Sequence, residues 1–207
     1  MSSRPAAVRP AVSEKRRQDL IAAAYHAIAE RGFEGLRTRD VATEAGVNIA
    51  TLHYYFPTKE AVIRGVVDYA MGRFRSTLAS HGEPVTQLRD HLRAVRRLLL
   101  AEPELGSVMI ELALRSSRDD AIGGILAETF AGWQTTMRAL LRRGVREGTL
   151  RPELDSAGAA ALVMATLSSY MLPVMRGSQI GDQALSQLER WLGATPARPR
   201  STARPPE

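Results

Sequence analysis

Cysteine is absent from the 207-residue sequence, and aromatic residues make up only 5% of it. The absence of cysteine excludes disulfides, zinc–thiolate sites and thiol catalysis, and it agrees with a reducing compartment. No run of about 18 uncharged apolar residues occurs, so the sequence predicts no membrane-spanning helix. The opening segment, MSSRPAAVRPAV, has no apolar core of the kind that signal peptides carry. We therefore expect a soluble, cytoplasmic protein with no membrane partner.

Lysine is also scarce, since it occurs only at Lys15 and Lys59, although the net charge is +6. The excess of positive charge lies at the two ends, residues 1–17 and 195–207, and the body between them is neutral. Positive charge on the ends favours a nucleic-acid partner only weakly, and genomic composition bias alone can enrich arginine. Charge therefore does not identify the partner.

Alanine, leucine and arginine dominate the sequence, and 44% of the residues are apolar, which favours a helical chain with a substantial core. Apolar residues recur at helical spacing, and no strand-like alternation of useful length is present. We predict an all-α fold of about nine helices. The expected helices cover about 13–31, 38–45, 48–56, a longer stretch after Thr58, and then 84–101, 103–116, 118–147, 155–176 and 182–193.

Capping residues and glycines set these expected boundaries. The expected N-caps are Thr38, Asn48, Thr58, Asp155 or Ser156, and Asp182. The glycines expected in left-handed turns are Gly32, Gly46 and Gly148. The two ends, 1–12 and 195–207, are rich in Pro, Arg and Ser without apolar periodicity, so we interpret them as a disordered basic arm and a disordered tail.

The segment TRDVATEAGVNIATLHYYF, residues 38–56, has the pattern of a helix-turn-helix. Two short helices that cross steeply need a small residue where they touch, and Ala42 supplies it. Gly46 stands four positions later, where the turn requires a positive φ. The side chains expected to pack one face against the preceding helix are Val41, Ala45, Val47, Leu52 and Tyr55.

An ordinary helical hairpin is the alternative for this segment. The outward face of its second helix argues against a hairpin, because a solvated face in this chain would mix charges of both signs and this face carries no acidic residue. The face comprises Asn48, Ile49, Ala50, Thr51, His53 and Tyr54. This pattern favours DNA binding.

The stretch GLRTRDVATEAGVNIATLHYYFPTKEAVI closely resembles the DNA-binding segment of the TetR/AcrR regulators. In that family a threonine opens the first motif helix, Ala-Gly-Val forms the turn, and a Tyr-Phe-x-x-Lys-Glu run leads into the next helix. The matching positions are Thr38, 45–47, 55–56 and 59–60. The resemblance is specific over about residues 13–75 and only architectural beyond them. His53 departs from it, because the family usually has tyrosine there, so an imidazole would replace a hydroxyl contact to phosphate.

The resemblance implies a homodimer that binds an inverted repeat in operator DNA. Residues 13–60 would form the three-helix DNA-binding domain, and residues 61–194 the helical ligand-binding and dimerisation domain. Thr38 and Asn48 would cap helices and offer donors to phosphates, and Arg39 would reach a guanine. The base edges in the major groove would be read by Ile49, Ala50 and Thr51. The DNA backbone would be held by His53, Tyr54, Tyr55 and Lys59. Contacts from Arg16 and Arg17 and a merely solvated basic arm remain alternatives.

The last two expected helices are unusually apolar, and small residues crowd the first of them, SAGAAALVMATLSSYML. One reading is internal core. The family's dimer is a four-helix bundle of these two helices from each chain, so the resemblance favours an interface. The predicted interface residues are Val163, Leu167, Met171, Leu188 and Trp191.

The middle helices hold large or adaptable side chains near a few polar groups. Such residues often only fill a core, but the family lodges its effector among these helices. The resemblance therefore predicts a pocket for a small apolar or aromatic molecule. Its predicted residues are Phe74, His91, Met109, Glu111, Phe130, Trp133 and Met137.

Other chemistry finds little support in the sequence. The four histidines have no metal-ligand spacing with each other or with a carboxylate pair. Gly123-Gly124 follows no strand and precedes no Gly-Lys-Ser/Thr, so it is not a phosphate loop. We expect no cofactor, no metal and no enzymatic activity. The predicted function is that of a DNA-binding regulator, a repressor that a ligand releases from DNA. One alternative is a ligand-independent or activating regulator. The other is a helical ligand carrier or scaffold whose helix-turn-helix no longer binds DNA. The sequence does not predict the operator, the regulated genes or the effector.

Overall fold

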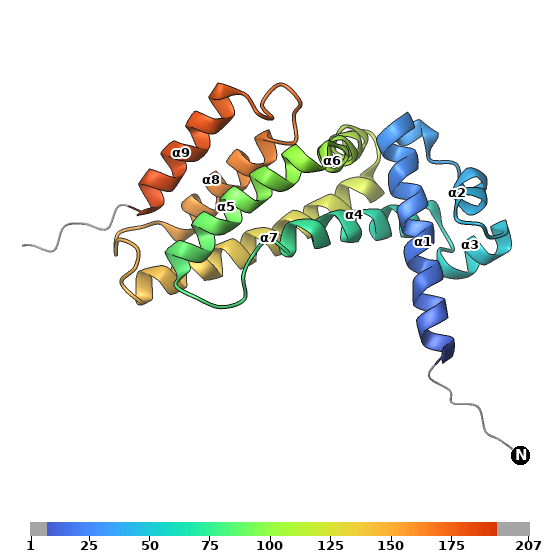
Figure 1. Cartoon of the computed structure of the whole chain (residues 1–207), viewed down its shortest axis with the longest axis horizontal. Coiled ribbons are helices and arrows are strands. Elements are labelled where there is room, and N and C mark those ends of the chain that lie inside the picture. The colour runs from blue at the N-terminus through green and yellow to red at the C-terminus, as the bar shows by residue number, and fades with distance from the viewer. Residues whose placement is uncertain (1–7, 194–207) are drawn as a thin grey trace, which may run out of the picture.

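The computed structural model describes residues 8–193, and in this range it contains nine α helices, one 3₁₀ turn and no strand. The all-α prediction is confirmed. The elements are α1 (Val8–Arg31), η1 (Phe33–Gly35), α2 (Thr38–Glu44), α3 (Ile49–Tyr55), α4 (Lys59–Arg75), α5 (Pro84–Ala101), α6 (Pro103–Ser116), α7 (Asp120–Arg146), α8 (Ser156–Ser169) and α9 (Gln179–Gly193). Helices α1 to α3 lie at one end of the molecule, and α4 runs from them into the body formed by α5 to α9 (Figure 1).

Local sequence signals account for most of the helix boundaries. Pro84 and Pro103 stand in the first turns of α5 and α6, where their missing N–H groups cost nothing, and both helices begin and end as predicted. The side chains of Asn48, Thr58 and Asp155 accept hydrogen bonds from backbone N–H groups of the next turn, as N-caps do. The three glycines expected in left-handed turns have positive φ: Gly32 (69°), Gly46 (67°) and Gly148 (69°).

Four predicted helix boundaries are wrong. Helix α1 reaches back to Val8, so residues 8–12 are helical rather than part of a disordered arm; the rest of that arm and the tail 195–207 lie outside the described residues. Arg37, not Thr38, takes the N-cap position of α2. Helix α8 ends at Ser169 rather than at 176, and α9 begins at Gln179, which puts Asp182 inside its first turn.

The apolar side chains of α1 to α3 belong to one core that continues into the body. Leu20, Ile28, Val41 and Leu52 are buried there, and the other apolar positions of the motif, Ala45, Val47 and Tyr55, pack against this core half-buried. Gly65 lets α4 approach α1 closely, because a Cβ there would lie 3.1 Å from the side chain of Ile21 and 3.2 Å from that of Phe56. The helix-turn-helix is therefore fixed directly to α4.

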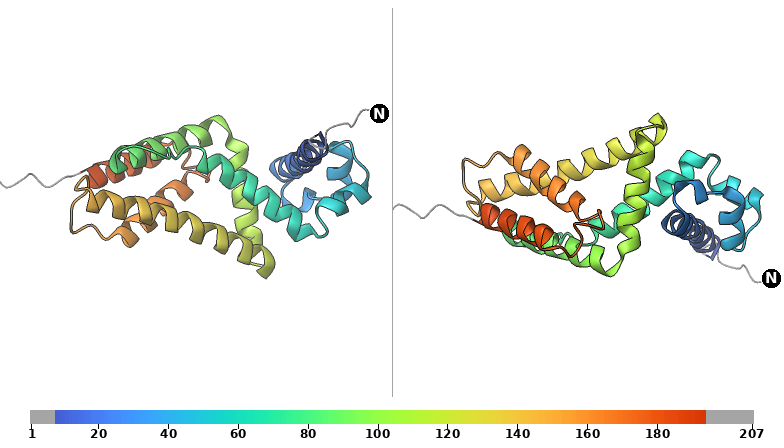
Figure 2. Two further views of the ribbon diagram at one scale, coloured as in Figure 1. Left: turned by 90° about the horizontal axis from the view of Figure 1, so that it is seen from below. Right: turned by 90° about the horizontal axis from the view of Figure 1, so that it is seen from above.

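In the body, the long helix α7 packs against α4, α5, α6 and α8, and α9 lies against α5 and α8 (Figure 2). Two ion pairs, in each of which a carboxylate accepts two hydrogen bonds from an arginine, join α5 to α9: Arg93 with Glu189, and Arg96 with Asp182. The hydroxyl of Tyr170 also donates to Asp182, at 3.1 Å. The Arg96 guanidinium lowers the pKa of Asp182, so this carboxylate is charged at neutral pH. No helix among residues 8–193 is both long and apolar enough to cross a membrane.

Candidate functional site

Helix α3 presents an uncharged face to solvent. Ile49 and Tyr54 are 37% and 80% exposed, which is unusual for large apolar or aromatic side chains, and Ala50 and His53 are exposed beside them. Asn48 is exposed at the N-terminus of the helix, where its side-chain oxygen accepts from the N–H of Thr51 at 2.8 Å. Half of the residues that the sequence predicts to contact DNA are therefore exposed on α3 and at its N-terminus.

Two predicted contact residues are partly engaged within the chain. Thr51 is half-buried, and its hydroxyl donates to the Asn48 side chain at 2.9 Å, so its methyl group is what remains to meet a base. Tyr55 is half-buried as well, and its hydroxyl lies 3.1 Å from that of Ser13 on α1. Tyr55 therefore holds α3 against α1.

Lys59, at the first turn of α4, borders a hollow of about 480 Å³ together with Thr38 and Arg39. The structure thus brings together three more of the predicted DNA-contact residues. The Lys59 ammonium lies 4.4 Å from the centre of the Phe33 ring, and the guanidinium of Arg115 on α6 lies 4.8 Å from the same centre. Cations near an aromatic ring are attracted to its face. The sequence does not predict this cluster, because Arg115 and Phe33 lie far apart in the chain.

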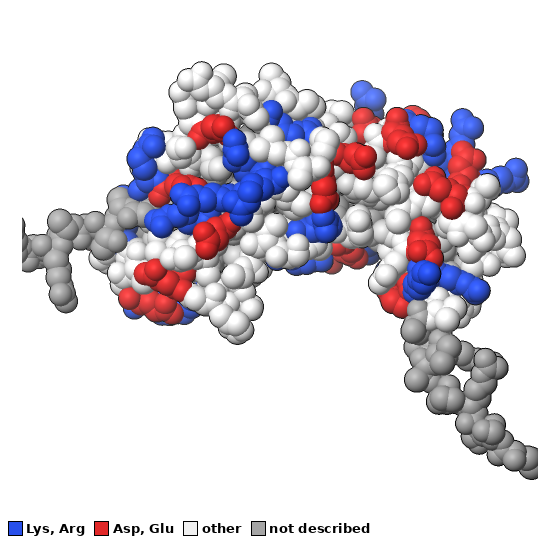
Figure 3. Space-filling model, in the orientation of Figure 1, with Lys and Arg blue, Asp and Glu red and all other residues white. Residues whose placement is uncertain are grey.

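The formal charge is unevenly distributed over the visible face. Lys and Arg side chains gather over the body of the molecule, whereas the end that carries α2 and α3 shows both signs (Figure 3). Helix α5 supplies a basic row in that body: Arg89, Arg93, Arg96 and Arg97. On this face, an excess of positive charge therefore does not mark the end that carries α2 and α3.

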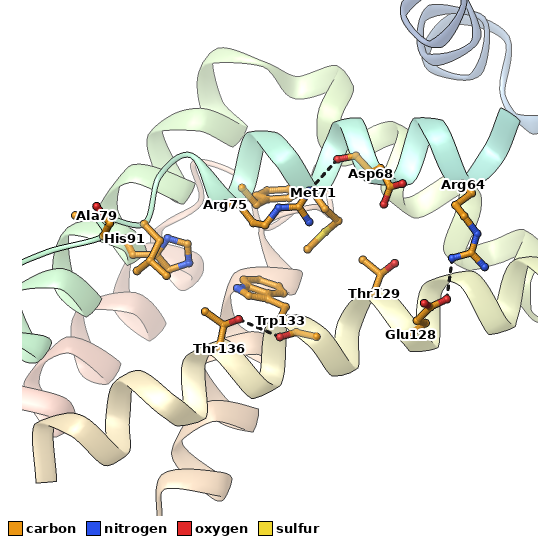
Figure 4. Close-up of a pocket in the computed structure, with 14 residues that line it drawn as sticks. Arg64, Asp68, Met71, Arg75, Ala79, His91, Glu128, Thr129, Trp133 and Thr136 are labelled. Atoms are coloured by element: carbon orange, nitrogen blue, oxygen red, sulfur yellow. Dashed lines mark hydrogen bonds and ion pairs between the residues drawn. The ribbon is translucent and has the colours of Figure 1, made fainter. Parts of the chain in front are cut away.

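A cavity of about 510 Å³ lies between α4, α7 and the segment that joins α4 to α5. Three of the seven predicted ligand residues line it: Phe74, His91 and Trp133. The rings of Phe74 and Trp133 are stacked, with centroids 6.2 Å apart and planes 18° apart. The other lining residues are Arg64, Asp68, Met71, Arg75, Leu78, Ala79, Ser80, Glu128, Thr129, Gly132 and Thr136. Figure 4 shows His91 at one end of this cavity, Trp133 in the middle, and the ion pair of Arg64 with Glu128 at the other end.

The other four predicted ligand residues do not line the cavity. Met109 and Met137 are buried in the core, and Phe130 is half-buried with its ring centroid 6.3 Å from that of Trp133. Glu111 on α6 faces the opposite way and accepts a hydrogen bond from the backbone N–H of Phe33 at 3.2 Å. Helical spacing predicts that these side chains point toward the interior. It does not predict which of the interior side chains line the cavity.

Four of the five predicted interface residues are not exposed on the single chain. Val163, Leu167, Met171 and Leu188 are buried inside the single chain, so they are core rather than surface. Trp191 alone is accessible, at 51% exposure. The apolar side chains that α8, α9 and the segment between them do expose are Leu162, Leu172, Val174, Ile180 and Trp191.

Metal binding has no candidate in the part of the chain that the structure describes, because no group of three or more His, Asp or Glu side chains is placed to hold an ion. His26 faces the carboxylate of Glu104 at 3.9 Å, and His91 bonds Thr77 at 2.8 Å, so neither belongs to a ligand set.

Comparison with known protein families identifies the family of this chain. Residues 20–66 match the family model described as bacterial regulatory proteins, tetR family, and residues 78–188 match that of the tetracyclin repressor-like C-terminal domain. The chain belongs to the TetR family. These matched segments cover both the helix-turn-helix and the helical body, so the TetR assignment extends over both domains.

Individual relatives agree with the TetR assignment. The transcriptional repressor KstR2 of Mycolicibacterium smegmatis is 28% identical over 151 residues, which are 70% of this chain and 73% of the relative. The fatty acid metabolism regulator protein of Bacillus subtilis is 24% identical over 79% of this chain and 85% of its own length. A crystal structure of a TetR-family regulator from Rhodococcus is 26% identical, with a TM-score of 0.70, and covers 87% of this chain and all of the other. The protein is therefore a DNA-binding transcriptional regulator with a helix-turn-helix, and its family is one of regulators rather than enzymes.

Proposed function

We propose that this TetR-family protein is a repressor that binds an inverted repeat as a homodimer and is released when a small apolar or aromatic molecule enters the cavity. The observation that carries the proposal is the position of the cavity on α4. Five of its lining residues come from α4 itself: Arg64, Asp68, Met71, Phe74 and Arg75. The same helix begins at Lys59 in the DNA-binding end, so a ligand that shifts α4 also shifts the helix-turn-helix.

A second connection supports such coupling. Helix α6 contacts the turn after α1 through Glu111, which accepts from the Phe33 N–H, and through Arg115, which lies over the Phe33 ring. Two helices of the ligand-binding body thus contact the DNA-binding end at separate points. A change in their relative position would alter the spacing of the two recognition helices of a dimer, which must enter successive major grooves roughly 34–36 Å apart.

The size and lining of the cavity support an apolar or aromatic effector. Its volume of about 510 Å³ lies within the range of small-molecule sites. The middle is lined by Met71, Phe74 and Trp133, whereas charged groups border the end near Arg64. One relative is named as a regulator of fatty acid metabolism. The KstR2 protein of Mycobacterium tuberculosis, which has the same fold, is named as a ketosteroid transcriptional regulator. Both names refer to largely apolar molecules. These names support the same chemical class here.

The exposed apolar side chains of α8 and α9 support the homodimer. Leu162 and Trp191 border a groove of about 440 Å³ between these helices, and Ile180 is 67% exposed near the start of α9. Clustered exposure of large apolar residues is typical of a contact surface. We therefore replace the four buried residues of the predicted interface by Leu162, Leu172, Val174 and Ile180, and we keep Trp191.

A matched pair of glycine variants on α7 tests the cavity as the effector site. Gly132 lines the cavity and Gly124 does not, yet both are exposed helix residues whose added Cβ would meet nothing within 4 Å. Gly132→Leu should reduce the cavity, and Gly124→Leu should leave it unchanged. The probe is 4-phenylphenol, an aromatic molecule with one polar group, titrated into the complex of protein and a duplex selected from random sequence.

We expect 4-phenylphenol to release the duplex from the wild type and from Gly124→Leu, and to release it from Gly132→Leu only at about tenfold higher concentration or more. Equal release from both variants would place the effector elsewhere. A protein that binds 4-phenylphenol and no duplex at all would instead support a helical ligand-binding protein with an inactive motif. The uncharged, exposed face of α3 argues against that alternative.

A further inference from the structure

One end of the cavity contains a buried polar group without a partner. His91 is 1% exposed, and its Nε2 atom has no hydrogen-bond partner among the described residues. Burial lowers the pKa of His91 to about 4, so its ring is neutral at physiological pH. A neutral imidazole carries one N–H donor and one acceptor nitrogen, and the neighbours of the ring decide which nitrogen is which.

The contacts of Thr77 assign the proton. The Thr77 hydroxyl has a single hydrogen, and its oxygen lies 2.7 Å from the carbonyl oxygen of Phe74, which can only accept. The hydroxyl hydrogen is therefore directed to Phe74. The Nδ1 atom of His91 lies 2.8 Å from the same hydroxyl oxygen, so Nδ1 must be the donor in that second bond. It follows that Nδ1 carries the ring proton and that Nε2 is a bare acceptor.

A buried acceptor without a donor is unfavourable, because it has lost its hydrogen bonds to water and gained none in return. The Trp133 ring, in the middle of the cavity, stands edge-on to that of His91 at 83°, with the two centroids 6.4 Å apart. A ligand that moves the Trp133 ring slightly and brings an O–H or N–H group to Nε2 recovers the missing hydrogen bond. A ligand with a carboxylate or an ether oxygen at that place brings a second acceptor, which Nε2 repels.

We propose that the effector of this protein is an aromatic or other apolar molecule with a hydroxyl group that donates a hydrogen bond to His91 Nε2. The inference rests on the proposed function, since it names the chemistry of that same cavity. The inference also predicts the orientation of the ligand in the cavity. The hydroxyl lies at the His91 end, the apolar body lies along Met71, Phe74 and Trp133, and the far end of the ligand faces the ion pair of Arg64 with Glu128.

The inference is tested with four probes that share one apolar body: biphenyl, 4-phenylphenol, 4-methoxybiphenyl and biphenyl-4-carboxylate. Binding to the full-length protein without DNA is measured by isothermal calorimetry, so the result does not depend on operator release. We expect 4-phenylphenol to bind about threefold to tenfold more tightly than 4-methoxybiphenyl, which has the same oxygen but no donor. Biphenyl-4-carboxylate should bind without any contribution from His91.

Two variants separate hydrogen-bond chemistry from packing. His91→Phe keeps a ring and removes both nitrogens, so it should bind the phenol and the ether equally well. Thr77→Val keeps the histidine but removes the hydroxyl that holds the proton on Nδ1. The ring can then place its proton on Nε2 and donate to an ether oxygen, so the preference for 4-phenylphenol over 4-methoxybiphenyl should fall by about threefold or more. A purely structural role of Thr77 would weaken both probes alike.

The outcomes distinguish this inference from the proposed function. If the phenol and the ether bind equally well to the wild type, or if His91→Phe keeps the preference for the phenol, the inference is overturned while the cavity remains the effector site. If none of the four probes binds and the fluorescence of Trp133 does not change, both the inference and the proposed cavity are overturned.

Discussion

The carboxylate of Glu111 on α6 accepts a hydrogen bond from the backbone N–H of Phe33, which lies 78 residues earlier in the chain, with 3.2 Å between the two atoms. The contact crosses from the ligand-binding body to the turn that follows α1. The same carboxylate lies against Gly32, where an added Cβ would come within 3.2 Å of its oxygen. Glu111 therefore fixes one end of α6 to the DNA-binding end.

Glu111→Ala should weaken the link between ligand and DNA without changing the binding of either alone. Glu111 does not line the cavity, so calorimetry should give an unchanged affinity for 4-phenylphenol. Coupling between two sites is typically 1–3 kcal/mol, and loss of part of it should raise the concentration needed for duplex release about fivefold. Asp90→Ala is the control, because Asp90 is an exposed carboxylate of α5 that does not line the cavity. Unchanged release by Glu111→Ala would mean that α4 alone carries the coupling.

Lys59→Ala should weaken binding to all duplex sequences alike. The Lys59 ammonium lies over the Phe33 ring in the free protein and borders the hollow beside Thr38 and Arg39, from which it can reach a phosphate. Each neutralised phosphate contributes about 0.9 to the slope of log affinity against log salt, so the slope should become shallower by about one unit. Thr51→Ala should instead change which bases are preferred. A Lys59→Ala variant with altered base preference and the original salt slope would contradict these roles.

The corrected dimer face predicts a clear difference between two kinds of leucine on α8. Leu162 is 41% exposed, so Leu162→Glu, combined with Trp191→Glu, should give a folded monomer that no longer binds an inverted repeat. Leu167 is fully buried, so Leu167→Glu should unfold the chain, because an unpaired buried charge costs several kcal/mol. Sedimentation and thermal unfolding check both results. A double variant that remains dimeric would place the interface elsewhere.

His91 should make the protein less stable as the pH falls. Its folded pKa is lowered to about 4 from an ordinary value of 6.5, so the unfolded chain binds the proton more readily between these values. Stability should therefore be full above pH 6.5 and decrease toward pH 4. The loss should be about 3 kcal/mol greater in the wild type than in His91→Phe. Denaturant unfolding at pH 7 and pH 4 measures the difference, and equal losses in the two proteins would show that His91 is accessible to protons when folded.

The sequence predicts much of this fold because its local signals agree with each other. Helices α5 and α6 begin at prolines and end where predicted, and Asn48 and Thr58 cap the helices that they were expected to cap. The exposed, uncharged face of α3 was also predictable, since a helix-turn-helix places its inward and outward positions at fixed spacings. These features depend on interactions between residues close in the chain.

The errors have local and long-range causes. The expected helix over 155–176 includes Pro173, which is unfavourable in a helix interior, and α8 ends at Ser169. Periodicity predicts that Leu167 is buried, but it does not predict whether its own chain or a partner chain buries it. Glu111 was assigned to the pocket for the same reason, since nothing near it in the sequence indicates Phe33 as its partner. The lining of the cavity likewise depends on how α4 and α7 cross.

The central claim is that a dimer reads DNA through the exposed face of α3, and selection of bound duplexes from a random pool tests it most directly. We predict enrichment of an inverted repeat whose half-sites lie about one helical turn apart. An Ala50→Glu variant, which places a negative charge on that face without disturbing a buried residue, should enrich nothing. The absence of any enriched sequence with the wild type, or recovery of the same repeat with Ala50→Glu, would contradict the account.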